Sequence, residues 1–296
     1  MFSIIIPSLN NLKYLKFCIN SIKKNSSLKH EILAHVNIGD DGTCDYLSKN
    51  NIDYTFSKYN AGICEGMNKA AQKASNDYIL YAHDDFYFCP DWDIILKNEL
   101  ESIGHNLFYL SGTMINNGQI SFDCGNTVED FNEKKFLKNY KNFNYYDFQG
   151  STWAPHLIHK DIWKKVGGFS EEYFPGTGSD PDLNMKLWKN GVRIFKGIND
   201  FKVYHFGSIV TRRYKDHPTI KTESGSRGAK IFLLKWGVSI DFFKKYIINS
   251  DTLYKGPLEE PKKNLLYFVD LFICKINYFY IKYIYNFKNK NKLSNK

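Results

Sequence analysis

The chain has 296 residues, of which 43% are hydrophobic and 24% charged, and its formal net charge is +9. These values are typical of a folded globular protein that buries a large core, and they exclude an intrinsically disordered chain. The positive charge fits an anionic partner such as a nucleotide, a nucleic acid or an anionic membrane surface. No compact nucleic-acid-binding motif is visible, so we expect no nucleic-acid partner.

In the first half, apolar runs indicate strands and helical periodicity indicates helices. The expected order is a strand at residues 2–6 that stops at Pro7, a helix at 12–22 capped by Asn10 or Asn11, a strand at 31–37, a short helix at 43–47, a strand at 54–56, a helix at 62–75 and a strand at 77–82. Such alternation predicts βαβ units with right-handed crossovers. The expected fold class is therefore α/β with a mostly parallel central sheet.

The second half is less regular. The expected elements are a helix at 91–103, strands at 107–111 and 154–158, a helix at 160–166, a helix at 182–189 and strands at 192–195 and 202–205. Pro181 suits the first position of a helix, which makes Asp180 the expected N-cap. Residues 115–148 show no clear hydrophobic periodicity, and we interpret them as a long irregular connection that leaves the sheet.

The six cysteines and the N-terminus bear on the cellular compartment. No two cysteines form a Cys-x-x-Cys pair, and no cysteine–histidine spacing matches a zinc site. Most cysteines lie in apolar segments, as small buried residues do in a reducing compartment. The first residues are strand-like, with no basic region and no cleavage site. We expect a cytoplasmic protein, with membrane association on the cytoplasmic face as an open alternative.

His83-Asp84-Asp85 follows the strand predicted at 77–82. Ligands of open α/β sheets bind at the carboxyl ends of the strands. Divalent cations prefer carboxylate oxygens and bridge them to phosphates. This segment is therefore a candidate metal–diphosphate site, and the alternative is a solvated strand end.

Four further segments place polar groups at element ends. They are the loop at residues 6–10, Asn60-Ala-Gly62 before the helix that contains Asn68, Gly178–Leu183 at a helix start, and Val203–Gly207 after a late strand. Each segment alone is ordinary turn or capping chemistry. Their order along the chain is more specific than any one of them.

In this order the chain resembles the inverting glycosyltransferases of family two, which have the Rossmann-like GT-A fold of nucleotide-diphospho-sugar transferases. The matching segments are Ser3–Pro7, Asn60-Ala-Gly62 with Asn68, Asp77–Asp85, Gly167-Gly168-Phe169, Asp180–Leu183 and His205. The resemblance implies a GT-A domain at 1–206, with a nucleotide-sugar half at 1–110 and an acceptor half at 111–206. A lid and helical extension at 207–260 and a basic aromatic tail at 261–296 are then expected.

The resemblance also implies roles for individual residues. Asp85, His205 and His83 would hold Mn²⁺ or Mg²⁺ on the diphosphate of the donor, which is expected to be a UDP-sugar. Asp180 would be the general base and Asp182 would shape the acceptor site, with Asp182 as the alternative base. The expected donor-binding residues are Pro7, Ser8, Asn10, Asn37, Asn60, Gly62, Asn68 and Asp84. The acceptor would be a glycan or a lipid-linked sugar, as in polysaccharide biosynthesis.

Three positions depart from the family pattern. His83 stands where the metal motif has its first Asp, Asn37 stands near the usual acidic pair, and Ser179 stands where a Glu usually precedes the base. These departures keep a second hypothesis open, namely a catalytically silent GT-A-like module that binds sugars or acts as a scaffold. Nucleotide-sugar turnover would distinguish the two.

Two later segments carry further expectations. The apolar stretch from Asn264 to Phe287 is interrupted by Asp270, Lys275 and Lys282, which argues against a membrane-spanning helix. It suits either an interfacial helix in peripheral contact with a membrane or a C-terminal helix packed on the domain. The segment 208–227, with Arg212, Arg213 and Lys215, is the expected lid over the donor diphosphate.

Overall fold

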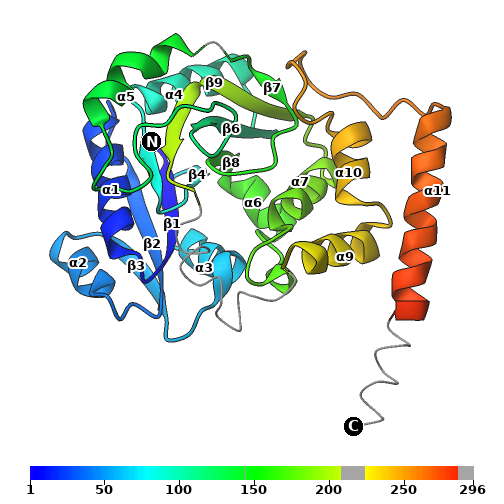
Figure 1. The fold of residues 1–296 in the computed structure, drawn as a ribbon, viewed down its shortest axis with the longest axis horizontal. Helices are drawn as coiled ribbons and strands as arrows, with labels where there is room; N and C mark the ends of the chain where they lie inside the picture. The colour runs from blue at the N-terminus through cyan, green and yellow to red at the C-terminus, as the bar shows by residue number, and fades with distance from the viewer. Residues whose placement is uncertain (144, 208–223, 286–296) are drawn as a thin grey trace, which may run out of the picture.

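The computed structural model describes residues 1–143, 145–207 and 224–285. A twisted sheet with helices on both faces forms the main body, and three C-terminal helices lie along one side of it (Figure 1). The expected α/β fold class is confirmed. The sheet arrangement matters for function because it determines which strand ends meet.

The first half alternates as predicted. Its elements are β1 (Ser3–Leu9), α1 (Leu12–Asn25), β2 (Glu31–Asn37), α2 (Thr43–Lys49), β3 (Asp53–Ser57), α3 (Gly62–Ala71) and β4 (Tyr78–Tyr81). β2 and β4 flank β1 and β3 flanks β2, all in parallel register. The carboxyl ends of these four strands therefore share one edge of the sheet.

The prediction that the first strand stops at Pro7 was wrong, because β1 continues to Leu9. Pro7 pairs with His35 of β2, whereas β4 pairs only with Ser3–Ile5 of β1. Proline lacks a backbone N–H and is tolerated where a strand has lost one neighbour. The strand therefore carries Ser8 beyond the end of β4, toward the residues that follow it.

The second half completes the sheet with mixed pairings. Its elements are β5 (Phe86–Phe88), α4 (Trp92–Ile103), β6 (Phe108–Ile115), α5 (Glu133–Asn139), η1 (Tyr140–Asn142), β7 (Phe148–Gln149), β8 (His156–His159), α6 (Lys160–Val166), η2 (Glu171–Tyr173), α7 (Ser179–Lys189) and β9 (Ile194–His205). The described residues contain nine strands in one sheet, ordered β3-β2-β1-β4-β8-β6-β9-β5, with β7 on β9.

Two strands differ from expectation. The separate strands predicted at 192–195 and 202–205 are one strand, β9, whose register against β6 shifts after Ile198. The irregular residues 199–201 interrupt the apolar pattern, which explains the prediction of two strands. The short strand β5 was not predicted, and it pairs antiparallel with the end of β9.

The C-terminal extension consists of α9 (Ser224–Trp236), α10 (Ile240–Phe242), η3 (Phe243–Ile247), α11 (Leu265–Phe279) and η4 (Tyr280–Tyr285). α9 contacts η2 and α10 contacts α9 and α11, while Figure 1 shows α11 at the margin of the molecule. Within the described part of the chain, no helix is long and apolar enough to cross a membrane.

Candidate active site

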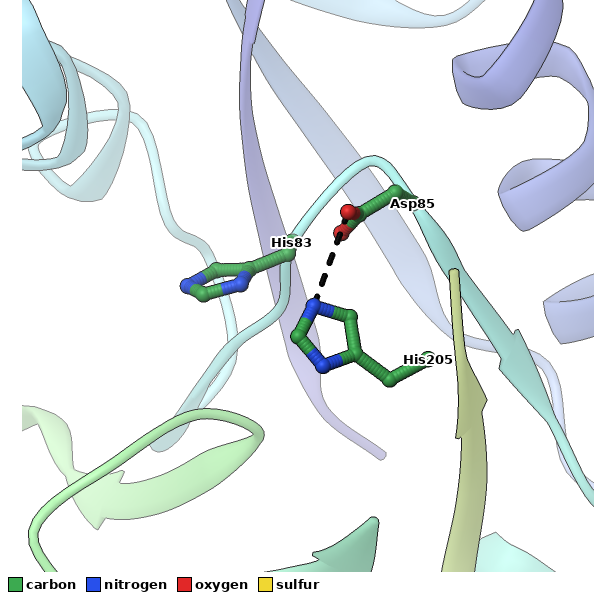
Figure 2. A group of neighbouring side chains, drawn as sticks. All are labelled: His83, Asp85 and His205. Atoms are coloured by element: carbon green, nitrogen blue, oxygen red, sulfur yellow. Dashed lines mark ion pairs between the residues drawn. The ribbon is translucent and has the colours of Figure 1, made fainter. Parts of the chain in front are cut away.

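Three predicted metal ligands come together beyond the end of β4. His83, Asp85 and His205 each offer a ligand atom, and these atoms lie within 4.8 Å of one another (Figure 2). The cross-strand pair between Phe86 of β5 and His205 of β9 brings the third residue to the first two. His205 Nε2 is 3.5 Å from Asp85 Oδ2. The cluster therefore depends on β5, which was not foreseen.

The proton on His205 can be assigned from its partner. Nδ1 lies 3.1 Å from the carbonyl oxygen of Asn117, which can only accept a hydrogen bond, so Nδ1 carries the proton. In the neutral ring Nε2 then presents a lone pair toward Asp85. Backbone carbonyls orient metal-binding histidines in this way. Asn117 was not predicted to take part in the site.

The protonation of His83 also suits a metal ligand. Burial lowers the pKa of His83 to about 4, although the nearby Asp85 carboxylate opposes this shift. The ring stacks on Phe86, with centroids 4.9 Å apart. A neutral imidazole at physiological pH is the form that binds a metal. Two imidazoles and one carboxylate form a donor set that suits Mn²⁺ better than Mg²⁺, which prefers oxygen ligands.

The second carboxylate, Asp84, faces the end of β1. It is buried, and its Oδ2 accepts a 2.6 Å hydrogen bond from Ser8 Oγ. Asn37, at the end of β2, donates to the Ser8 carbonyl and accepts from the backbone N–H of Ala61. Three predicted donor-binding residues are thus linked in one hydrogen-bonded group.

The neighbouring turns are held by their own side chains. Asn10 adopts a positive φ of 44°, and its Oδ1 accepts from the N–H groups of Gly39 and Asp40. Asn60 Oδ1 accepts from the Gly62 N–H. Gly62 has a φ of +74°, and a Cβ there would lie 2.9 Å from the Pro175 oxygen, so only glycine fits. A pocket of about 400 Å³ opens beside Asn10 and is lined by Asn10, Asn11, Leu12, Lys13, Lys16 and Asp41.

Asn68 is engaged elsewhere. Its Oδ1 accepts from the Phe169 N–H, and its Nδ2 donates to the Phe169 carbonyl and to Glu171 Oε1. These bonds fasten the loop after α6 onto α3. The contacts of Asn68 therefore serve the acceptor half of the domain, and its expected role in donor binding gains no support from them.

Asp180 is in the first turn of α7 and is not its N-cap, which corrects the prediction. The helix begins at Ser179, and Gly178, at φ +90°, is the N-cap. The Gly178 carbonyl accepts the first helical bond from Asp182, at 3.3 Å. Pro181 consequently occupies the third helical position, which also needs no N–H donor. Glycine reaches the left-handed turn that this start requires.

The Asp180 carboxyl differs from an ordinary exposed carboxyl in its pKa and in its hydrogen bonding. Burial raises its pKa from an ordinary carboxyl value to about 7, although Lys244 of η3 opposes the shift. Oδ1 is buried and has no hydrogen-bond partner among the described residues. A base with a pKa near the working pH takes up and releases a proton most effectively.

Asp182 is surrounded by donors. Its carboxylate accepts from Ser170 Oγ at 2.6 Å, Trp236 Nε1 at 2.8 Å and Lys235 Nζ at 3.0 Å. The side chain is fully buried. These contacts join α7 to α9 and leave little capacity for a substrate proton. Of the two predicted carboxylates, Asp182 is held by donors from α9, whereas Asp180 keeps one oxygen without a hydrogen-bond partner among the described residues.

Tyr81, the last residue of β4, is affected by the charges of both acidic sites. It is buried, and the charges of Asp180, Asp84 and Asp85 add to the effect of burial in raising its pKa. Its ring is 5.3 Å from that of His83. Sequence reasoning missed Tyr81 because a tyrosine in an apolar strand looks like ordinary core. The expected lid at 208–227 lies almost entirely outside the described residues.

An open α/β sheet with a His/Asp cluster that could hold a cation beyond the end of a central strand is the arrangement expected of nucleotide-sugar glycosyltransferases with the GT-A fold. Residues 3–167, more than half of the chain, match the model of glycosyl transferase family 2. The chain belongs to this family, and the resemblance found in the sequence is confirmed. A comparison with curated proteins found no matching sequence.

Solved structures of TarS from S. aureus are similar in fold. TarS 1–349 gives a TM-score of 0.56 at 15% identity, covering 94% of this chain and 71% of that one. Its complex with UDP-GlcNAc gives 0.56 at 14% identity, covering 94% and 72%. A further crystal structure of S. aureus TarS gives a TM-score of 0.57 at 16% identity, covering 94% of this chain and 43% of that one. At this identity the likeness concerns the fold.

Proposed function

We propose that this glycosyltransferase moves a sugar from a UDP-sugar to a hydroxyl of a glycan or lipid-linked acceptor, with inversion at the anomeric carbon and with Mn²⁺ as cofactor. The observation that carries the proposal is the cluster of His83, Asp85 and His205, whose ligand atoms lie within 4.8 Å of one another, together with the buried Oδ1 of Asp180, which has no hydrogen-bond partner among the described residues. Inversion needs a diphosphate site and a base on opposite faces of the sugar. TarS, which shares the fold, has been solved with UDP and with UDP-GlcNAc.

The cluster of His83, Asp85 and His205 is the proposed metal site. Its two neutral imidazoles and one carboxylate supply a donor set for Mn²⁺. The Asn117 carbonyl accepts a hydrogen bond from Nδ1–H of His205, which directs Nε2 toward Asp85. The bound ion would offset negative charge on the departing diphosphate.

Asp180 is the proposed base. Its Oδ1 takes the proton of the acceptor hydroxyl while the acceptor oxygen forms its bond to the anomeric carbon and the bond from that carbon to the diphosphate breaks. A pKa of about 7 leaves a large fraction of the carboxyl ionised at neutral pH. The buried surroundings that raise this pKa also exclude water that would compete with the acceptor.

The donor nucleoside is assigned to the edge formed by the ends of β1 and β2. Ser8 fixes Asp84 by a 2.6 Å hydrogen bond, so that this carboxylate is oriented for sugar or ribose hydroxyls. Asn37 ties the same strand end to the loop before α3, and Asn10 forms the turn beside it. Pro7, Asn60 and Gly62 contribute backbone shape at this edge.

The deciding experiment is a panel of nucleotide sugars assayed for transfer and hydrolysis with and without Mn²⁺. Turnover of a UDP-sugar that requires the metal, and its loss in Asp85→Ala, is the expected result. Nucleotide binding without turnover under any condition would overturn the proposal in favour of a silent sugar-binding module. Asp91→Ala, at an exposed aspartate before α4, is the matched control.

A further inference from the structure

The outward face of α11 is almost entirely apolar. Leu265 is 79% exposed, Phe272 63% and Phe279 58%. The other large apolar residues exposed on α11 and η4 are Leu266, Phe268, Val269, Ile273, Ile276, Tyr280 and Tyr283. Scattered exposed apolar residues are normal on proteins, but a contiguous apolar face along a helix marks an interaction surface.

The opposite face of α11 fixes how the helix sits. Tyr267, Leu271, Cys274 and Tyr278 of α11, with Ile281 of η4, recur every three or four residues and pack in one cluster with residues of α9, α10 and η3. Asp270 accepts hydrogen bonds from Lys245 Nζ and Tyr246 Oη of η3, at 2.8 and 2.7 Å. Because this face is already packed, the helix cannot rotate to bury its outward residues.

Lysines border the apolar face. Lys275 and Lys282 are exposed and seven residues apart, so they lie on the same side of the helix, between the packed and the outward faces. Lys262 and Lys263 are exposed just before α11. After Pro261 the sequence contains eight lysines and one acidic residue, Asp270, so this short stretch carries most of the net charge of the chain.

We propose that the outward face of α11 docks on an anionic membrane surface, with the helix lying in the plane of the interface. The aromatic and aliphatic side chains would enter the boundary between headgroups and acyl chains, and the lysines would contact anionic headgroups. A second copy of the chain is the weaker alternative, because two such basic stretches repel each other when they are brought together.

The test is flotation of the full-length protein with vesicles of phosphatidylcholine alone and with vesicles that also contain phosphatidylglycerol. We expect binding to the anionic vesicles that weakens as salt is added, and little binding to the neutral ones. Phe272→Ser and Phe279→Ser together should lower the affinity at least tenfold, since each buried phenylalanine contributes more than a factor of ten. Phe56→Ser is the matched control, because Phe56 is 44% exposed on β3, away from α11.

Charge is tested separately. Lys275→Glu with Lys282→Glu should weaken binding to anionic vesicles by at least about tenfold, since each lysine near such a surface contributes about a factor of five. Lys49→Glu with Lys73→Glu changes the net charge equally at two exposed positions away from α11, the end of α2 and the turn after α3, and should have a much smaller effect. Equal loss in both pairs would overturn the proposed site.

Two further results would overturn the proposal. One is binding to anionic vesicles that is unchanged in the Phe272→Ser/Phe279→Ser variant. The other is a stable dimer in light scattering that the same variant dissociates, which would assign the face to a second copy. Circular dichroism of each variant checks that α11 and the domain remain folded.

Discussion

His205 Nε2 lies 3.5 Å from Asp85 Oδ2 because His205 is directly opposite Phe86 in the antiparallel pair of β5 and β9. The proton on Nδ1 is directed to the Asn117 carbonyl, so in the neutral ring the lone pair on Nε2 faces the carboxylate. Two electron-rich atoms at this distance are stabilised by a cation between them. The pairing of two strand ends thus makes one site from residues far apart in sequence.

Removal of the metal or of its ligands should abolish transfer. We expect EDTA to stop turnover and Mn²⁺ to restore it better than Mg²⁺. Asp85→Ala and His205→Ala should each lower kcat/KM at least about a hundredfold, more than the loss of a residue that only orients a ligand. Steady-state kinetics measures the losses of kcat/KM, and calorimetry of UDP binding with and without Mn²⁺ measures the metal dependence of donor binding. His105→Ala, at an exposed turn, is the control, and metal-independent turnover in Asp85→Ala would refute the assignment.

Asp180→Asn should separate catalysis from stability. Transfer should fall by roughly a hundredfold or more, because a positioned general base is lost. Donor binding should be unchanged, and so should the helix start, because Gly178 is the N-cap of α7. The raised pKa means that ionised Asp180 destabilises the fold as pH rises from about 4 to 7, so the melting temperature of the variant at pH 8 should equal or exceed that of the wild type. Wild-type turnover in the variant would place the base elsewhere.

The pH dependence of the rate follows from the same group. A base works only when deprotonated, so kcat/KM should rise about tenfold per pH unit below pH 7 and level off above it. His83 should not contribute in this range, since its pKa of about 4 keeps it neutral. The profile is measured from pH 5 to 9 at saturating Mn²⁺. A rate that is flat from pH 5 to 8 would contradict the role of Asp180.

Asp182→Ala should act mainly on stability. Its loss leaves Ser170, Trp236 and Lys235 without their shared acceptor, and the free energy of unfolding should fall by about 2–4 kcal/mol. Trp236→Phe removes one of these bonds and should cost about 1 kcal/mol. Urea unfolding measures the free energy of unfolding, and transfer kinetics on the folded fraction measures kcat. A large loss of kcat without loss of stability would instead make Asp182 the base.

Ser8→Ala should weaken donor binding. The Ser8 hydroxyl donates to the buried carboxylate of Asp84 at 2.6 Å, and a hydrogen bond to a charged group contributes about 1.5–3 kcal/mol. We therefore expect the dissociation constant of the nucleotide sugar to rise about tenfold or more, with Mn²⁺ affinity unchanged. Ser26→Ala, which removes a helix-end hydroxyl bonded to the Ile22 carbonyl, is the control. Equal donor affinity in the two variants would remove Asp84 from the donor site.

Local patterns in the sequence determined the alternating half of the fold. The strand at Glu31–Asn37 and the helix at Lys160–Val166 have the predicted bounds, because alternation, apolar runs and turn residues act within a few positions. The family motifs likewise identified the carboxylates and the histidine at the strand ends. These signals are local, and so they can be found in a single sequence.

Only the tertiary structure decided what these residues do together. The start of α7 at Gly178 places Asp180 in the first turn of the helix and not at its cap, and burial there raises the pKa of its carboxyl to about 7. Asp182, only two residues further along the same helix, instead holds α7 to α9, because its carboxylate contacts Trp236 and Lys235 of α9. Asn117 orients the ring of His205, and the charges of Asp180, Asp84 and Asp85 all act on the buried Tyr81. Burial and long-range contacts control pKa values and hydrogen bonds, and neither is encoded by the spacing of residues along the chain.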